Sequence, residues 1–367
     1  MKYFDNASTT QMCQEAICVY NETNTNLFFN PSSMHKGGAY ASNKLENGKK
    51  NILKLLNADG KLIFTSGATE SNNLAILGCF KKGFKILSSN AEHPSVTNVL
   101  KNLNAEVDYA PINESGFVDI DKYTEMIKNH NYDFISIMHV NNETGAINDI
   151  KKLVQIAKNK NSKTIFHSDG TQSVGKIHVD LNNLGVDMFS FSAHKFYGPK
   201  GCGGLFYKKN INLKSQINGG GQQDNLRSGT ENLPAILAMQ KALELSIINL
   251  ETAYNYVSSL KDYALLNLSK KLNYKINGNG SPYILSISIP KIKGEVLLRN
   301  LEEKEFLIGT GSACSSKKEG NITLSNMGLN KGLIAGNIRI SFSNNNTIDD
   351  VKELINLIND IALQLQK

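Results

Sequence analysis

The chain has 367 residues, a hydrophobic content of 40% and a formal net charge of +7, the composition of an ordinary globular protein large enough for two domains. Its Lys–Lys pairs are scattered along the sequence and are not grouped with aromatic residues, which favours a solvated basic surface over a nucleic-acid site. No apolar run is long enough to cross a bilayer, and the start MKYFDNASTT lacks the apolar core of a signal peptide. We therefore expect a cytoplasmic protein with no membrane or nucleic-acid partner.

Strand and helix patterns alternate between residues 60 and 210. Short apolar runs indicate strands at residues 61–66, 84–90, 133–140, 163–169 and 187–192. Helical patterns lie between them, at residues 71–80 and 149–160. This alternation predicts an α/β fold whose mostly parallel sheet is covered by helices on both faces.

The C-terminal third is organised differently. Residues 233–272 form one long helical pattern, which we expect to leave the large domain as a connector. The following patterns are a strand at 283–289, a helix at 294–304, a strand at 337–343 and a last helix from Ile348. The predicted domains are a large domain of residues 13–255 and a small α+β domain of residues 1–12 and 256–367.

The chain contains five cysteines, namely Cys13, Cys18, Cys79, Cys202 and Cys314. They form no CxxC pair and no zinc-type spacing, so no metal site is predicted. An odd number of cysteines in a cytoplasmic chain indicates free thiols. Cys79, in a predicted helix, and Cys202, between glycines, are typical of small core residues, and we expect structural roles for Cys13 and Cys18 as well.

The segment FTSGATESNNL, residues 64–74, joins the end of a strand to the start of a helix through small residues. The backbone N–H groups of Gly67, Ala68 and Thr69 are expected to converge there as an anion site. The alternative is an ordinary helix cap by Ser66 or Thr69. The segment has neither a Walker lysine nor GxGxxG, so nucleotide binding is not supported.

Polar residues follow three other predicted strands. Asp169 ends the strand of HSDGTQ, where it could hold a protonated ring nitrogen or merely cap the following turn. His93 precedes Pro94 after another strand, although a histidine in a loop is often only structural. Lys195 follows the strand DMFSFS in the stretch FSFSAHKFYGPKGCGG. A phosphate cradle, an aspartate, a histidine and a lysine at one sheet edge are the set that pyridoxal 5'-phosphate needs.

Cys314 lies in the run IGTGSACSSKK, residues 308–318, among small and hydroxyl residues. Lys317 and Lys318 follow it closely, and nearby cations favour the thiolate, which is the nucleophilic form of cysteine. This cysteine is therefore predicted to take part in chemistry.

These motifs together resemble those of the cysteine desulfurases of the NifS/IscS type, pyridoxal-phosphate enzymes of the class-V aminotransferase family. The similarity runs over nearly the whole chain and is carried, in the family's order, by TSGATESNNLAI, MHVNNETG, HSDGTQSVGK, SFSAHKFYGPKG, RSGTEN and GSACSS. The resemblance implies fold type I, with a seven-stranded, mostly parallel sheet in the large domain and a small domain that carries the cysteine loop. One departure is Gly170, where relatives commonly have alanine, and we expect its effect to be minor.

The resemblance also implies roles for single residues. Lys195 would form the Schiff base with the cofactor, Asp169 would pair with its ring nitrogen, and His93 would stack on the ring and move protons. The phosphate would be bound by Ala68, Thr69, Ser192 and His194, and by Thr230 of the neighbouring subunit in a homodimer. The remaining expected roles are cofactor contacts for Asn142 and Gln172, substrate contacts for Arg339, Asn142 and Asn6, and places lining the site for Asn30 and His35.

The implied reaction removes sulfur from L-cysteine and leaves L-alanine. The thiolate of Cys314 would take the sulfur as a persulfide and pass it to an acceptor protein, such as a scaffold for iron–sulfur cluster assembly. The alternatives are a selenocysteine lyase or another class-V aminotransferase, and, from a different class, a non-catalytic protein that kept the fold.

Overall fold

The largest sheet has seven strands in the order β2-β8-β7-β6-β5-β3-β4, in a computed structural model that describes residues 1–310 and 321–365. The strands are β2 (Lys61–Thr65), β3 (Lys85–Ser89), β4 (Glu106–Ala110), β5 (Phe134–Ser136), β6 (Ile165–Asp169), β7 (Met188–Ser192) and β8 (Gly203–Tyr207). Neighbouring strands are parallel except at β8, which runs antiparallel to β2 and β7. The predicted α/β fold with a mostly parallel sheet is confirmed, although the sequence patterns did not indicate β4 or β8.

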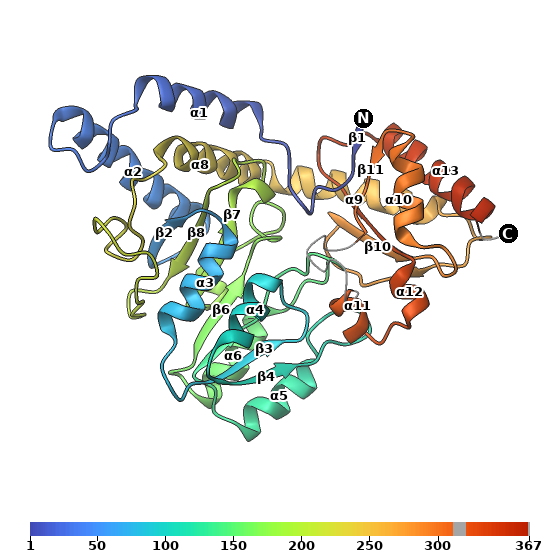
Figure 1. The fold of residues 1–367 in the computed structure, drawn as a ribbon, viewed down its shortest axis with the longest axis horizontal. Coiled ribbons are helices and arrows are strands. Elements are labelled where there is room, and N and C mark those ends of the chain that lie inside the picture. The colour runs from blue at the N-terminus through green and yellow to red at the C-terminus, as the bar shows by residue number, and fades with distance from the viewer. Residues whose placement is uncertain (311–320, 366–367) are drawn as a thin grey trace.

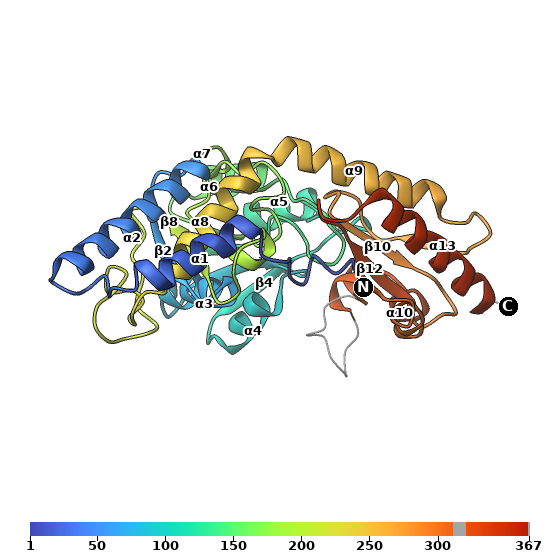
Figure 2. The same ribbon diagram turned by 90° about the horizontal axis from the view of Figure 1, so that it is seen from above.

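Helices cover both faces of this sheet (Figures 1 and 2). They are α1 (Gln14–Asn26), α2 (Lys36–Leu55), α3 (Ala68–Cys79), α4 (Pro94–Asn102), α5 (Ile120–Asn129), α6 (Ile150–Lys160), α7 (Leu181–Leu184) and α8 (Leu233–Ile248). Along β2 the side chains alternate, so that Leu62 and Phe64 pack in one core with α2, α6 and α8 while Ile63 packs in another with α3 and α4. Burial on both faces explains why these strands read as continuous apolar runs.

The long helical pattern after residue 233 contains two helices instead of one. α8 ends at Ile248 and α9 (Leu250–Asn267) begins after Asn249, with a bend of 71° between their axes. The bend lets α8 contribute Ala238 and Met239 to the core of the large sheet while α9 contributes Val257 and Leu260 to a second core. Within the described residues, no single helix is long and apolar enough to span a membrane, and only this bent pair passes such a test.

The second core lies around a three-stranded antiparallel sheet of order β12-β10-β9. Its strands are β9 (Lys275–Ile276), β10 (Ile284–Ser288) and β12 (Asn337–Ser341), and a parallel pair joins β1 (Lys2–Tyr3) to β11 (Phe306–Leu307). The helices of this part are α10 (Gly294–Glu302), α11 (Ile322–Asn326), α12 (Lys331–Ala335) and α13 (Ile348–Leu365). Phe4, near the N-terminus, packs in this second core. The domain boundaries at residues 12/13 and 255/256 stay a prediction.

Gly170 lies in a closely packed position. It directly follows β6, and a Cβ built on it would overlap the ring of Phe189, a fully buried residue of neighbouring β7. In this structure the packing around the sheet therefore leaves no room for a methyl group at this position.

Replacing Gly170 by alanine is expected to lower the free energy of unfolding by about 1–3 kcal/mol, because the buried Phe189 ring must leave its rotamer. Denaturant unfolding measures this change. The matched control is Gly48→Ala in α2, where a Cβ would make only ordinary contacts and helix propensity predicts a gain of up to about 1 kcal/mol. Adding Phe189→Leu to Gly170→Ala should recover most of the loss, and failure to do so would refute the assigned clash.

Candidate active site

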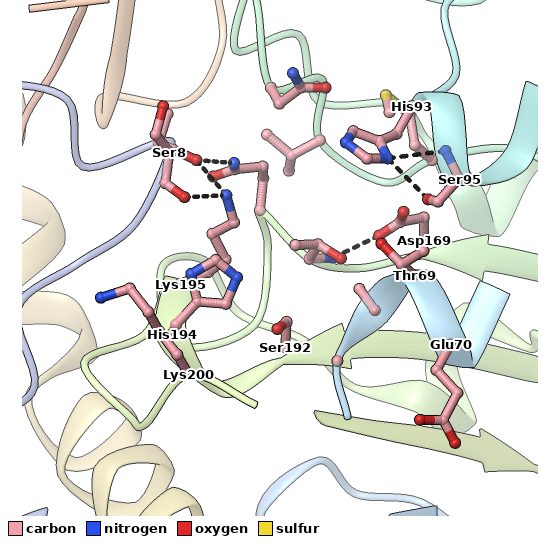
Figure 3. Close-up of a pocket in the computed structure, with 18 of the residues that line it drawn as sticks. Ser8, Thr69, Glu70, His93, Ser95, Asp169, Ser192, His194, Lys195 and Lys200 are labelled. Atoms are coloured by element: carbon pink, nitrogen blue, oxygen red, sulfur yellow. Dashed lines mark hydrogen bonds between the residues drawn. The ribbon is translucent and has the colours of Figure 1, made fainter. Parts of the chain in front are cut away.

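A cavity of about 480 Å³ lies at the carboxyl ends of β2, β3, β6 and β7. Because parallel strands end at one edge of the sheet, the loops after them converge there. The residues predicted for the site that line this cavity are Ala68, Thr69, His93, Asn142, Asp169, Gln172, Ser192, His194, Lys195 and Arg339. In Figure 3, Lys195 and His93 lie on opposite sides of the drawn pocket.

One wall of the cavity is the N-terminus of α3. Its N-cap is Gly67, which has no side chain to cap the helix and whose φ of +151° is rare for other residues. No side chain caps the helix, so neither predicted cap, Ser66 or Thr69, is present. The Glu70 side chain folds back over the first turn, where its Oε2 accepts from the Ser66 N–H at 2.8 Å. The first-turn N–H groups of α3 have no intrahelical acceptors, and Ser192 Oγ would lie 3.4 Å from a Cβ at Gly67. Of the two alternatives for this segment, the geometry favours the anion site.

Lys195 ends a 3-10 turn, Ala193–Lys195, that directly follows β7. Its Nζ donates to the backbone carbonyls of Ala7 at 2.6 Å and Ser8 at 2.7 Å. The N-terminal segment therefore holds the amine at the cavity, as Figure 3 shows for Ser8. Next to it, burial and the charges of Lys195 and Lys200 lower the pKa of His194 to about 4, so this imidazole is neutral at pH 7.

Asp169 is buried at the end of β6, and two donors hold its carboxylate. Asn72 Nδ2 donates to Oδ2 at 2.7 Å, and the backbone N–H of Thr171 donates to Oδ1 at 2.9 Å. Asp169 therefore caps its turn through one oxygen and also lines the cavity, while its pairing with a ring nitrogen stays a prediction.

His93 is the N-cap of α4. The backbone N–H of Ser95 donates to His93 Nδ1 at 3.1 Å, so Nδ1 is an acceptor and the proton of the neutral ring is on Nε2. Burial lowers the pKa of His93, which favours this neutral form. Ser95 Oγ, 2.8 Å from the same Nδ1, also accepts from Asn72 Nδ2 at 2.8 Å. Asn72 thus connects His93, through Ser95, with Asp169.

Arg339 comes from β12 and is only 3% exposed. Its guanidinium donates to Asp5 Oδ1 at 2.9 Å, Ser8 Oγ at 2.7 Å and the Asn142 carbonyl at 2.9 Å. Its buried Nε has no hydrogen-bond partner among the described residues, and the same holds for Thr171 Oγ1, which also belongs to a residue of the cavity wall. A bound anion or hydroxyl group could satisfy these groups.

Several predicted residues do not line the cavity. Thr230 is exposed and lines an adjoining hollow that shares Ser66 and Gly201 with the main cavity. The Asn6 amide donates to the Ser341 carbonyl at 2.9 Å, so it ties the N-terminal segment to β12. The exposed Asn30 and His35 bind the N–H groups of Ser32 and Gly38 in local turns. Cys314 lies outside the described residues, and all of these roles stay predictions.

Asn72, Ser95 and Glu92 were not predicted from the sequence. Asn72 is completely buried on α3, and polar side chains on a helix that otherwise reads as core are the signal that could have found it. Glu92 is also buried, and its Oε1 accepts from Ser89 Oγ at 2.6 Å and from the Met138 N–H at 2.9 Å. Burial raises the pKa of Glu92 to about 8.

Asn72→Ala is expected to lower the free energy of unfolding by about 1–3 kcal/mol, because Asp169 and Ser95 both lose a buried donor. The matched control is Asn73→Ala, since Asn73 is partly exposed and donates only to the Thr69 carbonyl of its own helix. Denaturant unfolding should show a larger loss of the free energy of unfolding for Asn72→Ala than for Asn73→Ala. Equal losses would mean that the Asn72 hydrogen bonds contribute little to stability.

Glu92 gives a pH dependence with a definite sign. Its pKa is raised in the folded state, so its contribution to stability is complete below the unfolded value of 4.5 and is lost as pH rises toward about 8. Glu92→Gln should remove this loss, and its stability relative to the wild type should increase by up to about 1.4 kcal/mol per pH unit between pH 5 and 8. Glu114→Gln serves as the control, because Glu114 is exposed. Parallel curves of stability against pH for the wild type and both variants would contradict the raised pKa of Glu92.

Comparisons with known proteins agree on one family. The aminotransferase class-V family model matches residues 2–354. The protein "Cysteine desulfurase IscS" of Dictyoglomus turgidum is 36% identical, over 99% of this chain and 95% of its own length, and that of Methanosarcina thermophila is 33% identical, over 99% and 92%. A solved "NifS-like protein" superposes with a TM-score of 0.92 at 30% identity over 99% of both chains. The structure "SspA in complex with cysteine" superposes with a TM-score of 0.82 at 29% identity over 94% of this chain and 99% of that one. The chain belongs to the class-V aminotransferase family and, within it, to the group of NifS/IscS-type cysteine desulfurases.

Proposed function

We propose that this chain is a pyridoxal-phosphate-dependent cysteine desulfurase that converts L-cysteine to L-alanine and carries the sulfur on Cys314. The observation that supports it best is the meeting of Lys195, Asp169, His93 and Arg339 around one cavity, together with relatives of that name over the whole chain. A structure titled as a complex with cysteine belongs to the same fold, which supports cysteine as the substrate.

The residues of the cavity fit the cofactor. The N-terminus of α3 with Thr69, Ser192 and neutral His194 suits a phosphate group, and Asp169 offers a carboxylate for a protonated ring nitrogen. Lys195 is the amine to which the cofactor aldehyde would attach. When bound, pyridoxal phosphate supplies an electron sink for the carbanion that forms when the substrate loses its Cα proton.

Each side chain then has a defined task. Arg339 holds the substrate carboxylate, for which its unpaired Nε is available. The amine of Lys195 would take the Cα proton, and the Ala7 and Ser8 carbonyls would stabilise and orient the resulting ammonium. His93 offers its Nε2 proton to the cavity because Ser95 occupies Nδ1.

Cys314 completes the reaction as its nucleophile. Its thiolate attacks the sulfur of the substrate, a new S–S bond forms, and the Cβ–S bond of the substrate breaks. The departing carbon takes up a proton and leaves as alanine. In sum, L-cysteine and the Cys314 thiol give L-alanine and a Cys314 persulfide, so no oxidant or reductant is consumed. This role rests on the sequence, because Cys314 lies outside the described residues.

A homodimer and a sulfur-accepting protein, such as an iron–sulfur scaffold, belong to the same proposal, as does a cytoplasmic location. Support for the homodimer comes from the exposed Thr230, whose loop is joined to α3 by the ion pair of Arg227 Nε with Glu70 Oε1 at 2.9 Å. In this arrangement Thr230 would serve the phosphate site of the neighbouring subunit. The small domain would carry Cys314 to the substrate.

The test supplies the chain, loaded with pyridoxal phosphate, with L-cysteine and a reductant, and measures alanine and sulfide. Cys314→Ser should lower both by about a hundredfold or more, while the visible absorption of the bound cofactor persists. Mass spectrometry should find one extra sulfur on Cys314 of the wild type. Cys18→Ser is the matched control, because Cys18 is an exposed free thiol and should leave the rate unchanged.

Three results would contradict the proposal. Sulfide release by Cys314→Ser at the wild-type rate would remove Cys314 from the mechanism. Amino-group transfer to a 2-oxo acid without sulfide release would instead identify an aminotransferase. A preference for selenocysteine, seen in kcat/KM, would identify a selenocysteine lyase.

A further inference from the structure

Lys176 is a lysine buried beside the cavity, and the proposed reaction does not use it. It is 1% exposed, and its Nζ lies 5.8 Å from the ring centroid of Tyr283. Burial and the charges of Lys195 and Arg339 lower its pKa to about 7. Among the described residues Lys176 forms no salt bridge, so its ammonium form is costly to bury. A group in so unfavourable a position needs an explanation from its contacts.

The hydrogen bond of Lys176 goes to a residue of the cavity wall. Its Nζ donates to Gln172 Oε1 at 2.9 Å, and Gln172 Nε2 donates to the Ala7 carbonyl at 2.8 Å. Gln172 and Lys176 are four residues apart in consecutive turns after β6, and the hydrogen bond shows that their side chains meet. The two bonds together hold a buried amide at both of its ends.

These contacts fix which end of the amide faces which neighbour. In its ammonium form Lys176 is only a donor, and the Ala7 backbone carbonyl is only an acceptor. Turning the Gln172 amide over would place its NH₂ against the Lys176 donor and its oxygen against the Ala7 carbonyl, which are two repulsive contacts. The second N–H of Gln172 Nε2 therefore stays available to a ligand of the cavity that Gln172 lines.

The same carbonyl connects Gln172 with Lys195. Ala7 accepts from both Gln172 Nε2 and, at 2.6 Å, Lys195 Nζ. Three hydrogen bonds thus run from Lys176 through Gln172 and Ala7 to the amine at the cavity. The orientation of that carbonyl depends on the Gln172 amide, and the amide depends on Lys176.

We propose that Lys176 is a positioning residue, whose hydrogen bond sets the Gln172 amide with its nitrogen toward the cofactor and thereby holds the Ala7 carbonyl against Lys195. The role rests on the proposed function, since it concerns the residues that would hold pyridoxal phosphate. Lys176 does not line the cavity and acts through its hydrogen bond to Gln172.

The test is Lys176→Met, which keeps the length of the side chain and removes its donor. The cofactor-free variant is titrated with pyridoxal phosphate, and the affinity and the visible absorption band of the bound cofactor are recorded. The affinity should fall about tenfold, with a shifted band, because the amide is free to turn over. The thermal stability should be unchanged or higher, since a buried cation without a carboxylate partner is removed. Lys176→Arg, which keeps a donor-only cation, should restore most of the affinity and the original band.

Lys261→Met is the matched control. Lys261 is also a buried lysine, with a pKa lowered by burial to about 8, but its Nζ donates to the Ser281 carbonyl and it does not line the cavity. This variant should bind pyridoxal phosphate as the wild type does. In a double-mutant cycle, Lys176→Met should add nothing to the loss of cofactor affinity caused by Gln172→Ala, because each change removes the oriented Gln172 amide.

Three outcomes would overturn the role of Lys176. Lys176→Met could bind pyridoxal phosphate with the affinity and absorption band of the wild type, or Lys261→Met could lose as much affinity as Lys176→Met. The third outcome is that the affinity losses of Lys176→Met and Gln172→Ala add up in the double variant. A Lys176→Met variant too unstable to titrate, with Lys176→Arg also failing to bind, would assign Lys176 a structural role instead. The proposed function fails separately, if the wild type binds pyridoxal phosphate but releases no sulfide from cysteine. That result would leave the role of Lys176 intact.

Discussion

The N-terminal segment joins the two halves of the cavity, and the geometry of the site depends on it. Phe4 packs in the core of the three-stranded sheet, and three residues later, at Ala7, the chain reaches Lys195 at the edge of the seven-stranded sheet. There the carbonyls of Ala7 and Ser8 accept from Lys195, while Ser8 Oγ and Asp5 accept from Arg339. The Lys195 amine, from the seven-stranded sheet, and the Arg339 guanidinium, from the three-stranded sheet, are thus held by the same short N-terminal segment. A shift of this segment would therefore change the positions of the Lys195 amine and the Arg339 guanidinium together.

Charge in the cavity is balanced to receive an anionic ligand. Lys195, Arg339 and Lys200 face it, and the neighbouring carboxylates of Asp5 and Asp169 are engaged by hydrogen bonds within the protein. Burial keeps the two imidazoles of the wall, His93 and His194, neutral at pH 7. A ligand with a phosphate or a carboxylate therefore meets cations and neutral donors, with the α3 N-terminus adding its partial positive charge.

The sequence predicted the parts of this arrangement that depend on local pattern. Strand ends can be found from apolar runs, and Asp169, His93 and Lys195 each follow one, so their convergence was predictable from the rule for parallel sheets. The break at Asn249 was not predictable, because α8 and α9 have continuous helical periodicity and separate only through the two cores on which they pack. The clash at Gly170 was hidden for a similar reason, since Phe189 becomes its neighbour only through strand pairing.

His93 and Asp169 each form a local capping bond and also line the cavity. His93 caps α4 through Nδ1, and that bond is what leaves the proton on Nε2. Asp169 caps its own turn through Oδ1, and that bond fixes the carboxylate that lines the cavity. In both residues the capping bond restricts rotation of the side chain and sets its protonation or its direction. The cap is therefore the cause of the functional geometry, because a side chain held at one end presents its other end in a single orientation.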